Sequence, residues 1–227
     1  MLENLVERIS PSSTIGKIVV ATTTNSEDDA IEALCAKRAW AVYRGSDWDV
    51  LDRFYNAAVA NNAQSGDNIV RICCDNALHS HQVVDFVVGE FLKLGVDYFS
   101  NSNQEPDFLE DGFDVEVTTF NALATAWKEA KMMSQREHVM PYIKDSGKFS
   151  LAWRKAHSKY NFKLSVDTEN DLKVSQAIFS SLAGNPDFSI DEVVDLLEKK
   201  PEILDLNKDS EINSGYKKSL SEDKEIS

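Results

Sequence analysis

The segment from Ile69 to His81 gathers two cysteines, two histidines and one aspartate within thirteen residues. These residue types could hold zinc, but structural zinc sites space their ligands as C-x₂₋₄-C and H-x₃₋₅-H. Cys73 and Cys74 are adjacent, so on a strand they would point to opposite faces, and His79 lies only two residues before His81. We therefore interpret the cysteines as small core side chains and the histidines as the start of a helix.

Asp75 is the residue in this segment whose position suits chemistry. It follows an apolar run and precedes a helical pattern, which places it at the carboxyl end of a strand, where open α/β sheets bind ligands. A carboxylate there suits Mg²⁺, which prefers oxygen ligands and bridges to phosphates. The same position also suits the N-cap of the following helix, and position alone leaves both interpretations open.

Short apolar, β-branched runs alternate with amphipathic segments along the first half of the chain, which predicts an α/β fold with a largely parallel sheet. We expect one domain over residues 1–206, followed by a polar C-terminal tail over 207–227. The predicted strands are 17–21, 40–43, 69–74, 97–100, 113–118 and 162–166. The predicted helices are 2–9, 25–34, 50–58, 83–91, 120–131, 136–144, 169–183 and 190–199.

The net charge, the cysteine count and the length of the apolar runs restrict the classes of partner and compartment. A net charge of −14 argues against nucleic acid or an anionic membrane as the main partner, although a nucleotide needs only a local positive pocket or a metal ion. Three cysteines, two of them adjacent, do not suit a disulfide framework, and no apolar run approaches the ~20 residues that span a bilayer. We therefore expect a cytoplasmic protein.

Several segments, in order along nearly the whole chain, resemble the SpsF-like cytidylyltransferases, a family similar to CMP-KDO synthetases and acylneuraminate cytidylyltransferases. The most characteristic are Arg44-Gly-Ser-Asp-Trp-Asp-Val-Leu-Asp-Arg-Phe-Tyr55 and Asp111-Gly-Phe-Asp-Val-Glu-Val117. The others are 18–30, 71–76, 136–143, 164–172, 185–189 and 215–220.

The resemblance implies a GT-A-like, Rossmann-type nucleotide-binding fold with a mixed, mostly parallel sheet. It also implies transfer of CMP from CTP to an acidic or related sugar, with release of pyrophosphate, for surface polysaccharide synthesis. Such chemistry depends on positioning and on a metal ion that offsets phosphate charge, so the implied cofactor is Mg²⁺. Family members often form homodimers, and a homodimer is therefore among the implied states.

The family's metal ligands correspond to Asp75 and Asp167, which both follow apolar runs. For Asp167, which precedes Thr168, a helix cap is the alternative. Arg44, Gly45 and Ser46 lie between a strand and a helix, where backbone amides could meet an anion. The further nucleotide- or substrate-binding residues that the resemblance implies are Arg71, Gly112, Glu116, Arg136 and His138.

Relatives in this family begin with a strand and a loop of the form Q-A-R-x-G-S-x-R-L-P-G-K, which holds the nucleotide phosphates. The segment from Met1 to Ile9 resembles the helix that follows this loop, and no glycine-rich basic stretch replaces the loop elsewhere in the chain. We therefore expect the printed chain to be impaired, with unpaired backbone where the strand would lie. Either it is a shortened form of a working nucleotidyltransferase, or it is a non-catalytic homologue that binds a sugar or a protein; the DNA upstream of Met1 separates the two.

Overall fold

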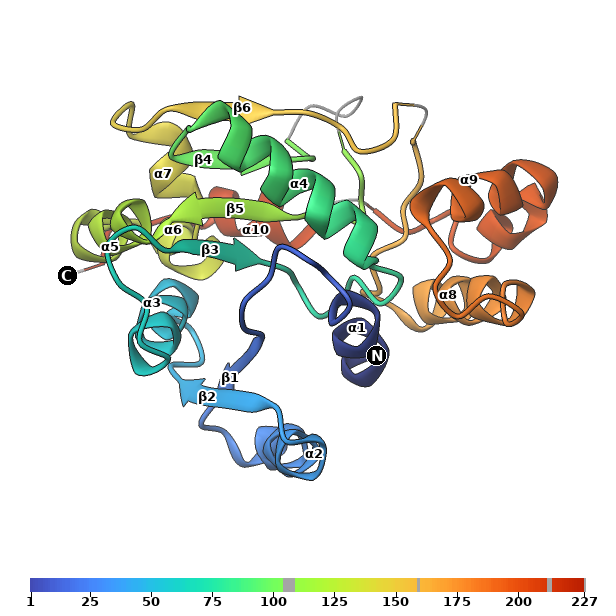
Figure 1. Ribbon diagram of the computed structural model, residues 1–227, viewed down its shortest axis with the longest axis horizontal. Helices are drawn as coiled ribbons and strands as arrows, with labels where there is room; N and C mark the ends of the chain where they lie inside the picture. The colour runs from blue at the N-terminus through green and yellow to red at the C-terminus, as the bar shows by residue number, and fades with distance from the viewer. Residues whose placement is uncertain (104–108, 159, 212–213, 227) are drawn as a thin grey trace. The chain divides into compact units, whose positions relative to one another are not determined.

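The computed structural model describes residues 1–103, 109–158, 160–211 and 214–226, and it divides into two compact units. Unit 1 comprises Met1–Gly16, Val70–Val117 and Ala152–Ile212. Unit 2 comprises Lys17–Ile69, Thr118–Leu151 and Asn213–Ser227. The ribbon diagram shows the elements of both units (Figure 1).

Unit 1 is built on a four-stranded sheet with the order β3-β5-β4-β6, three of whose strands extend by one or two residues into unit 2. The strands are β3 (Asn68–Arg71), β4 (Tyr98–Ser100), β5 (Glu116–Thr119) and β6 (Leu151–Trp153). The helical elements are α1 (Leu2–Ile9), α4 (His81–Leu94), α8 (Glu169–Ser181), α9 (Ile190–Lys199) and η3 (Pro201–Leu206). The sheet is therefore assembled from segments far apart in sequence.

The core of unit 1 lies between the sheet and its helices. β4 and most of β5 are buried, and α4 packs against β4 with an apolar face that includes Val84 and Val87. Phe99 and Phe113 are fully buried in this core. Burial of such large apolar side chains is the main favourable contribution to folding, so it fixes where the strand ends lie.

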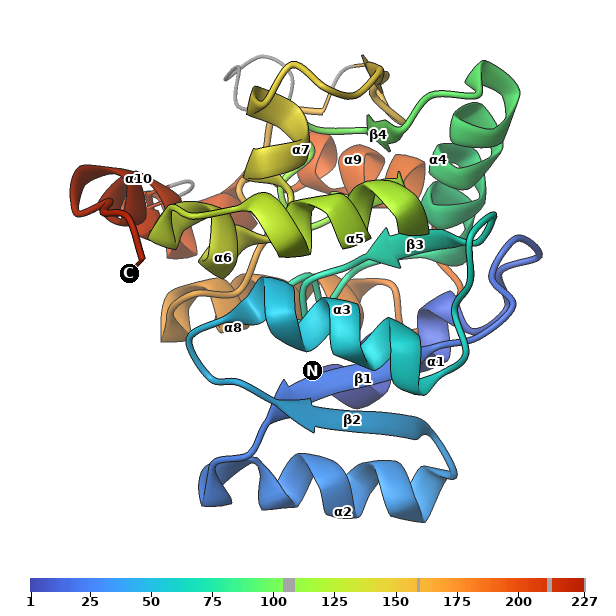
Figure 2. The same ribbon diagram turned by 90° about the vertical axis from the view of Figure 1, so that its left-hand side faces the viewer.

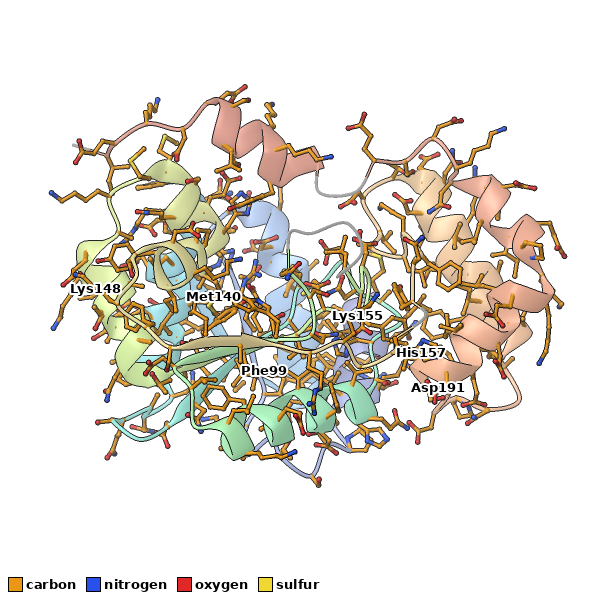
Figure 3. All side chains as sticks on the ribbon, turned by 90° about the horizontal axis from the view of Figure 1, so that it is seen from above. Phe99, Met140, Lys148, Lys155, His157 and Asp191 are labelled. Atoms are coloured by element: carbon orange, nitrogen blue, oxygen red, sulfur yellow. The ribbon has the colours of Figure 1, made fainter. Side chains whose placement is uncertain are left out.

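The described residues between β6 and α8 are irregular in structure but are held by side-chain contacts. His157 Nε2 lies 3.4 Å from Asp191 Oδ1 in the first turn of α9 (Figure 3). Further along, residues 162–166 were predicted as a strand, and this prediction is wrong. Their amide groups bind side-chain and loop oxygens instead, because Leu164 and Ser165 donate to the carboxylate of Asp111.

Unit 2 contains a two-stranded parallel sheet in which Val19 of β1 (Val19–Thr23) is opposite Ala41 of β2 (Ala41–Gly45). Figure 2 shows the two strands between α2 (Asp29–Arg38) and α3 (Val50–Ala60). The remaining elements are η1 (Ser26–Asp28), α5 (Phe120–Glu129), α6 (Met133–His138), α7 (Pro141–Asp145) and α10 (Ser214–Ser221). The sequence predicted one sheet, whereas the described strands form two.

Two further differences from the sequence prediction occur in unit 2. The helix predicted over 136–144 is divided into α6 and α7, because Val139 between them has a φ of 72°, which an α-helix cannot accommodate. The polar segment after residue 207 contains α10, and Ser134 binds the carboxylate of Asp223 through both its amide and its hydroxyl group. Part of this segment is therefore ordered against α6.

The α/β class expected from the sequence is confirmed, since helices and strands alternate along most of the chain. Within the described ranges, no helix has both the length and the apolar character that crossing a membrane requires.

Candidate active site

Asp75 lies in the loop that follows β3. It is not the N-cap of α4, because α4 begins at His81 with Ser80 as its N-cap residue. The backbone oxygen of Asp75 accepts a hydrogen bond of 3.0 Å from the amide of Val166. Its Oδ1 atom is buried and has no hydrogen-bond partner among the described residues. A buried polar atom without a partner is costly, so this oxygen is a candidate ligand for a bound group.

Asp167 is brought to the same place by the Val166–Asp75 hydrogen bond. Thr168 rather than Asp167 caps α8, with a reciprocal hydrogen bond to Asp171. Burial raises the pKa of Asp75, and the charge of Asp167 raises it further. The structure therefore places the two carboxylates predicted as metal ligands close enough to repel each other, and neither acts as the helix cap considered as the alternative.

The turn Asp111-Gly-Phe-Asp114 ties together the segments that carry these two carboxylates. Asp111 accepts hydrogen bonds from the amides of Leu164 and Ser165, both at 2.7 Å. Asp114 Oδ1 accepts one of 2.9 Å from Asn76, the neighbour of Asp75. The turn is thus bonded to the chain beside each candidate ligand.

Gly112 makes the close approach of this turn to residue 164 sterically feasible. Its φ is +87°, and a Cβ at this position would lie 2.8 Å from the carbonyl carbon of Leu164. The role expected for Gly112 was nucleotide or substrate binding, which stays a prediction. What the geometry shows directly is a packing requirement.

Arg71 and Glu116 form an ion pair of 2.6 Å between the end of β3 and the start of β5. Tyr98 on β4 donates to the other oxygen of Glu116 at 2.7 Å. Asp114 is near this pair: burial raises the pKa of Asp114 to about 7, and the charge of Glu116 adds to the effect. Glu116 therefore joins three strands, and the carboxylates around it are electrostatically coupled.

The residues around Asp75 fit a hard divalent cation. Among the described residues there is no group of three or more His, Cys, Asp or Glu arranged to hold a metal ion. Mg²⁺ does not need such a cage, because it is commonly bound by one or two carboxylates together with water and substrate phosphates. Two carboxylates that interact electrostatically, one of them with an unpartnered buried oxygen, match that mode of binding.

The cysteines and histidines of the opening segment have other environments. Burial raises the pKa of Cys73 to about 12, whereas Cys74 is exposed, so the prediction of a core position is wrong for Cys74. His79 is fully buried, and burial lowers its pKa to about 4, so it is neutral at physiological pH. His81 is the first residue of α4, as expected, and lies 3.2 Å from Asp187.

Arg44, Gly45 and Ser46 lie in unit 2, at the junction between β2 and α3. The Arg44 guanidinium binds Asp29 at 2.7 Å and Glu32 at 2.8 Å. A side chain at Gly45 would meet the ring of Tyr43 at 2.9 Å. These contacts give the segment a structural role, and its role in anion binding stays a prediction.

Arg136 and His138 are also in unit 2, on α6. Nε and Nη2 of Arg136 contact the carboxylate of Asp49 at 2.6 to 3.0 Å, and both side chains are largely buried. Asp49 also caps α3. The His138 ring lies edge-on to Tyr216 of α10 at 4.7 Å between ring centres. The described contacts of both residues lie within unit 2.

Sequence reasoning missed the positioning roles of Asp111, Asp114 and Lys163. Asp111 and Asp114 flank a glycine in a compact turn, which was a usable signal for side-chain-to-backbone hydrogen bonds. Lys163 lies 2.7 Å from Asp167. Its i, i+4 spacing would suggest a helical pair, yet the segment is irregular, so this contact could not be derived from periodicity.

Comparisons with known proteins identify the family of this chain. A family model described as cytidylyltransferase matches residues 1–208. An uncharacterized protein of Methanocaldococcus jannaschii is 39% identical over 214 residues, covering 91% of this chain and 83% of that protein. The spore coat polysaccharide biosynthesis protein SpsF of Bacillus subtilis is 28% identical over 211 residues, covering 89% and 85% respectively.

Among solved structures, a cytidylyltransferase from Leptospira borgpetersenii is similar to this chain with a TM-score of 0.81 at 26% identity. The match covers 89% of this chain and 84% of that one. The family match extends over both units, including the segments that bear Asp75 and Asp167. This chain belongs to the cytidylyltransferase family.

Proposed function

We propose that this protein transfers CMP from CTP to an acidic or related sugar and releases pyrophosphate, using a GT-A-like fold and Mg²⁺. The observation that supports this most is the unpartnered, buried Oδ1 of Asp75 beside a second carboxylate, Asp167. The similarity to SpsF supports a sugar acceptor used in surface polysaccharide synthesis. We place the activity in the cytoplasm, and a homodimer is the assembly that the family suggests.

Asp75 and Asp167 would hold the metal through their carboxylate oxygens. When bound, Mg²⁺ supplies charge compensation for the phosphoryl oxygens of the nucleotide. The acceptor hydroxyl attacks the α-phosphorus in line, and the new P–O bond forms as the bond to pyrophosphate breaks. The hydroxyl proton passes to the surrounding water.

The protein's own contribution to this step is positioning. The Val166–Asp75 hydrogen bond joins the segments that bear the two carboxylates, and Asp111 and Asp114 hold the chain next to each. The Arg71–Glu116 pair fixes the end of β3 against β5. Because catalysis of this type depends on placing charge accurately, loops that are joined by several hydrogen bonds are suited to it.

The test is release of pyrophosphate from CTP with Mg²⁺ and a panel of sugar acids. It is run on the printed chain and on a version that includes any in-frame sequence upstream of Met1. Asp75→Asn should lower the rate by on the order of 100-fold or more, because a charged group aimed at the reacting phosphate is lost. Asp195→Asn, on the exposed surface of α9, removes the same charge and should have no effect.

Unchanged pyrophosphate release by Asp75→Asn would remove Asp75 from the mechanism. Binding of a nucleotide or a sugar without any pyrophosphate release, in both versions of the chain, would favour the non-catalytic homologue instead. Release with UTP or another nucleotide in place of CTP would correct the base but keep the reaction class.

A further inference from the structure

Lys163 is held at the candidate active site by three oxygen atoms. Its Nζ donates to the backbone oxygen of Ser165 at 2.7 Å and to Asp167 Oδ2 at 2.7 Å, and lies 3.1 Å from Asp171 Oδ2. A lysine ammonium has three hydrogens, so these contacts can use all of them. One of the two candidate metal ligands is thus already paired with a cation from the protein itself.

This lysine is charged in spite of its surroundings. Its side chain is 8% exposed, and burial alone would lower its pKa. Hydrogen bonds with Asp167 and Asp171 outweigh the burial and raise the pKa of Lys163 above its ordinary value. A full positive charge therefore lies next to Asp167 at neutral pH.

The two carboxylates that hold Lys163 differ in exposure. Asp171 is fully buried. It accepts hydrogen bonds from the Thr168 hydroxyl at 2.8 Å, the Thr168 amide at 2.9 Å and the Asn207 side chain at 2.9 Å. Asp167 is 47% exposed. Asp171 would therefore still pair with Lys163 if Asp167, whose Oδ2 also accepts a 3.3 Å hydrogen bond from the Ser165 hydroxyl, bound another cation.

We propose that Lys163 is an internal counter-cation for Asp167, which a divalent cation must displace from Oδ2 before it can bind at Asp75 and Asp167. The inference rests on the metal site of the proposed function. Two cations that share one carboxylate compete for it and repel each other. Lys163 accordingly lowers the affinity of the site for a free divalent cation, so that the metal enters together with nucleotide phosphates, whose charge offsets the lysine.

The experiment measures the Kd for Mn²⁺, a paramagnetic substitute for Mg²⁺, from the electron paramagnetic resonance signal of the free ion. It compares the wild-type chain with Lys163→Met, at constant pH and ionic strength. Loss of the lysine charge should tighten Mn²⁺ binding by at least about tenfold, because even strongly screened repulsion between a unit charge and a divalent ion a few ångströms away is of that size. If Lys163 only held Asp167 in position, its loss would instead weaken Mn²⁺ binding, because a poorly positioned Asp167 would bind the ion less well.

Two variants serve as controls. Lys163→Arg keeps the charge and should keep a Kd close to that of the wild type. Lys199→Met removes an exposed lysine that also lies four residues from an aspartate, Asp195 at 4.0 Å, and should leave the Kd unchanged. Unchanged or weaker Mn²⁺ binding by Lys163→Met overturns the proposal.

A second measurement uses the unaltered protein, in case Lys163→Met does not fold. Acetylation of Lys163 by an N-hydroxysuccinimide ester is followed by peptide mass spectrometry with and without saturating Mn²⁺. Release from Asp167 should raise the labelling rate of Lys163 several-fold relative to that of Lys199. An equal rate in both conditions overturns the proposal.

The outcomes separate this inference from the proposed function. If Asp75→Asn weakens Mn²⁺ binding but neither Lys163 measurement shows a change, the counter-cation role fails and the metal site stands. If Asp75→Asn binds Mn²⁺ as the wild type does, or if no form of the chain binds it, the metal site and the role of Lys163 both fail. Pyrophosphate release is scored independently of all these results.

Discussion

Charged side chains are arranged in opposite ways in the two units. In unit 2, Arg136 contacts both carboxylate oxygens of Asp49, and Arg44 is paired with Asp29 and Glu32. In unit 1, Asp75 retains a buried oxygen with no partner among the described residues, and burial raises the pKa of Asp114 to about 7. The charged side chains named in unit 2 thus stabilise its fold, whereas the carboxylate of Asp75 in unit 1 keeps an oxygen available to a ligand.

The difference shows which observation identifies a site. A charged residue at the end of a strand is compatible with ligand binding, but it is available only if neighbouring segments leave part of its hydrogen-bonding capacity unused. A carboxylate with an unpartnered buried oxygen carries an energetic cost that a cation can relieve. Four changes would break or sharpen this contrast.

The largest effect is expected for Arg136→Met in unit 2. It leaves Asp49 largely buried without its cation, and breaking a buried pair in this way costs about 3–5 kcal/mol. Urea unfolding followed by tryptophan fluorescence measures the loss. The Mn²⁺ affinity should remain that of the wild type, since the ion pair lies within unit 2. A large change in Mn²⁺ affinity with little loss of stability would instead make Arg136 part of the site.

Gly112→Ala should reduce the stability of unit 1 by about 2–4 kcal/mol. The added Cβ meets the backbone of residue 164 at 2.8 Å, and the positive φ of +87° is strained for alanine. Gly95→Ala is the matched control, because Gly95 also has a positive φ but no atom within 4 Å of a Cβ, and should cost about 1 kcal/mol. Equal losses for the two variants would show that close packing around the Asp111–Asp114 turn is unimportant.

His79 should make the stability of unit 1 sensitive to acid. Its pKa is about 4 in the folded chain against an ordinary value of 6.5, so the unfolded chain binds the proton more tightly. Its contribution is therefore complete above pH 6.5 and is lost as the pH falls toward 4, by up to about 3 kcal/mol. Urea unfolding at pH 7 and pH 4.5 measures this loss. The free energy of unfolding should fall less from pH 7 to pH 4.5 in His79→Gln than in the wild type. Identical losses of stability in the two proteins would contradict the low pKa of His79.

The smallest effect is expected for Arg44→Gln. Its partners Asp29 and Glu32 are 65% and 51% exposed, and exposed ion pairs contribute about 0–1 kcal/mol. Thermal unfolding at low and high salt should show a small difference that decreases as salt rises. A loss comparable to that of Arg136→Met would mean that Arg44 is more important to unit 2 than its exposure indicates.

Local patterns were sufficient for most of the elements. The apolar spacing in residues 2–9 and 190–199 predicted α1 and α9, and the β-branched runs predicted β1 and β3 to within a few residues. The prediction failed for 162–166, where the amide groups bind Asp111 and Asp75 instead of a neighbouring strand. A strand pattern and an extended loop look alike in sequence, and only the distant partner distinguishes them.

The sequence by itself determined the α/β class and the family, because these follow from periodicity and from short motifs in a recognisable order, and it supplied Asp75 and Asp167 as the proposed metal ligands. Only the tertiary structure decided that Asp75 keeps an unpartnered oxygen and that Lys163 forms an ion pair with Asp167. It also decided that Asp111 and Asp114 accept hydrogen bonds from the chain next to these carboxylates. The physical reason is that burial and hydrogen-bond satisfaction depend on which segments meet in space. In unit 1, for example, Asp75 and Val166 meet although they lie about ninety residues apart in the sequence.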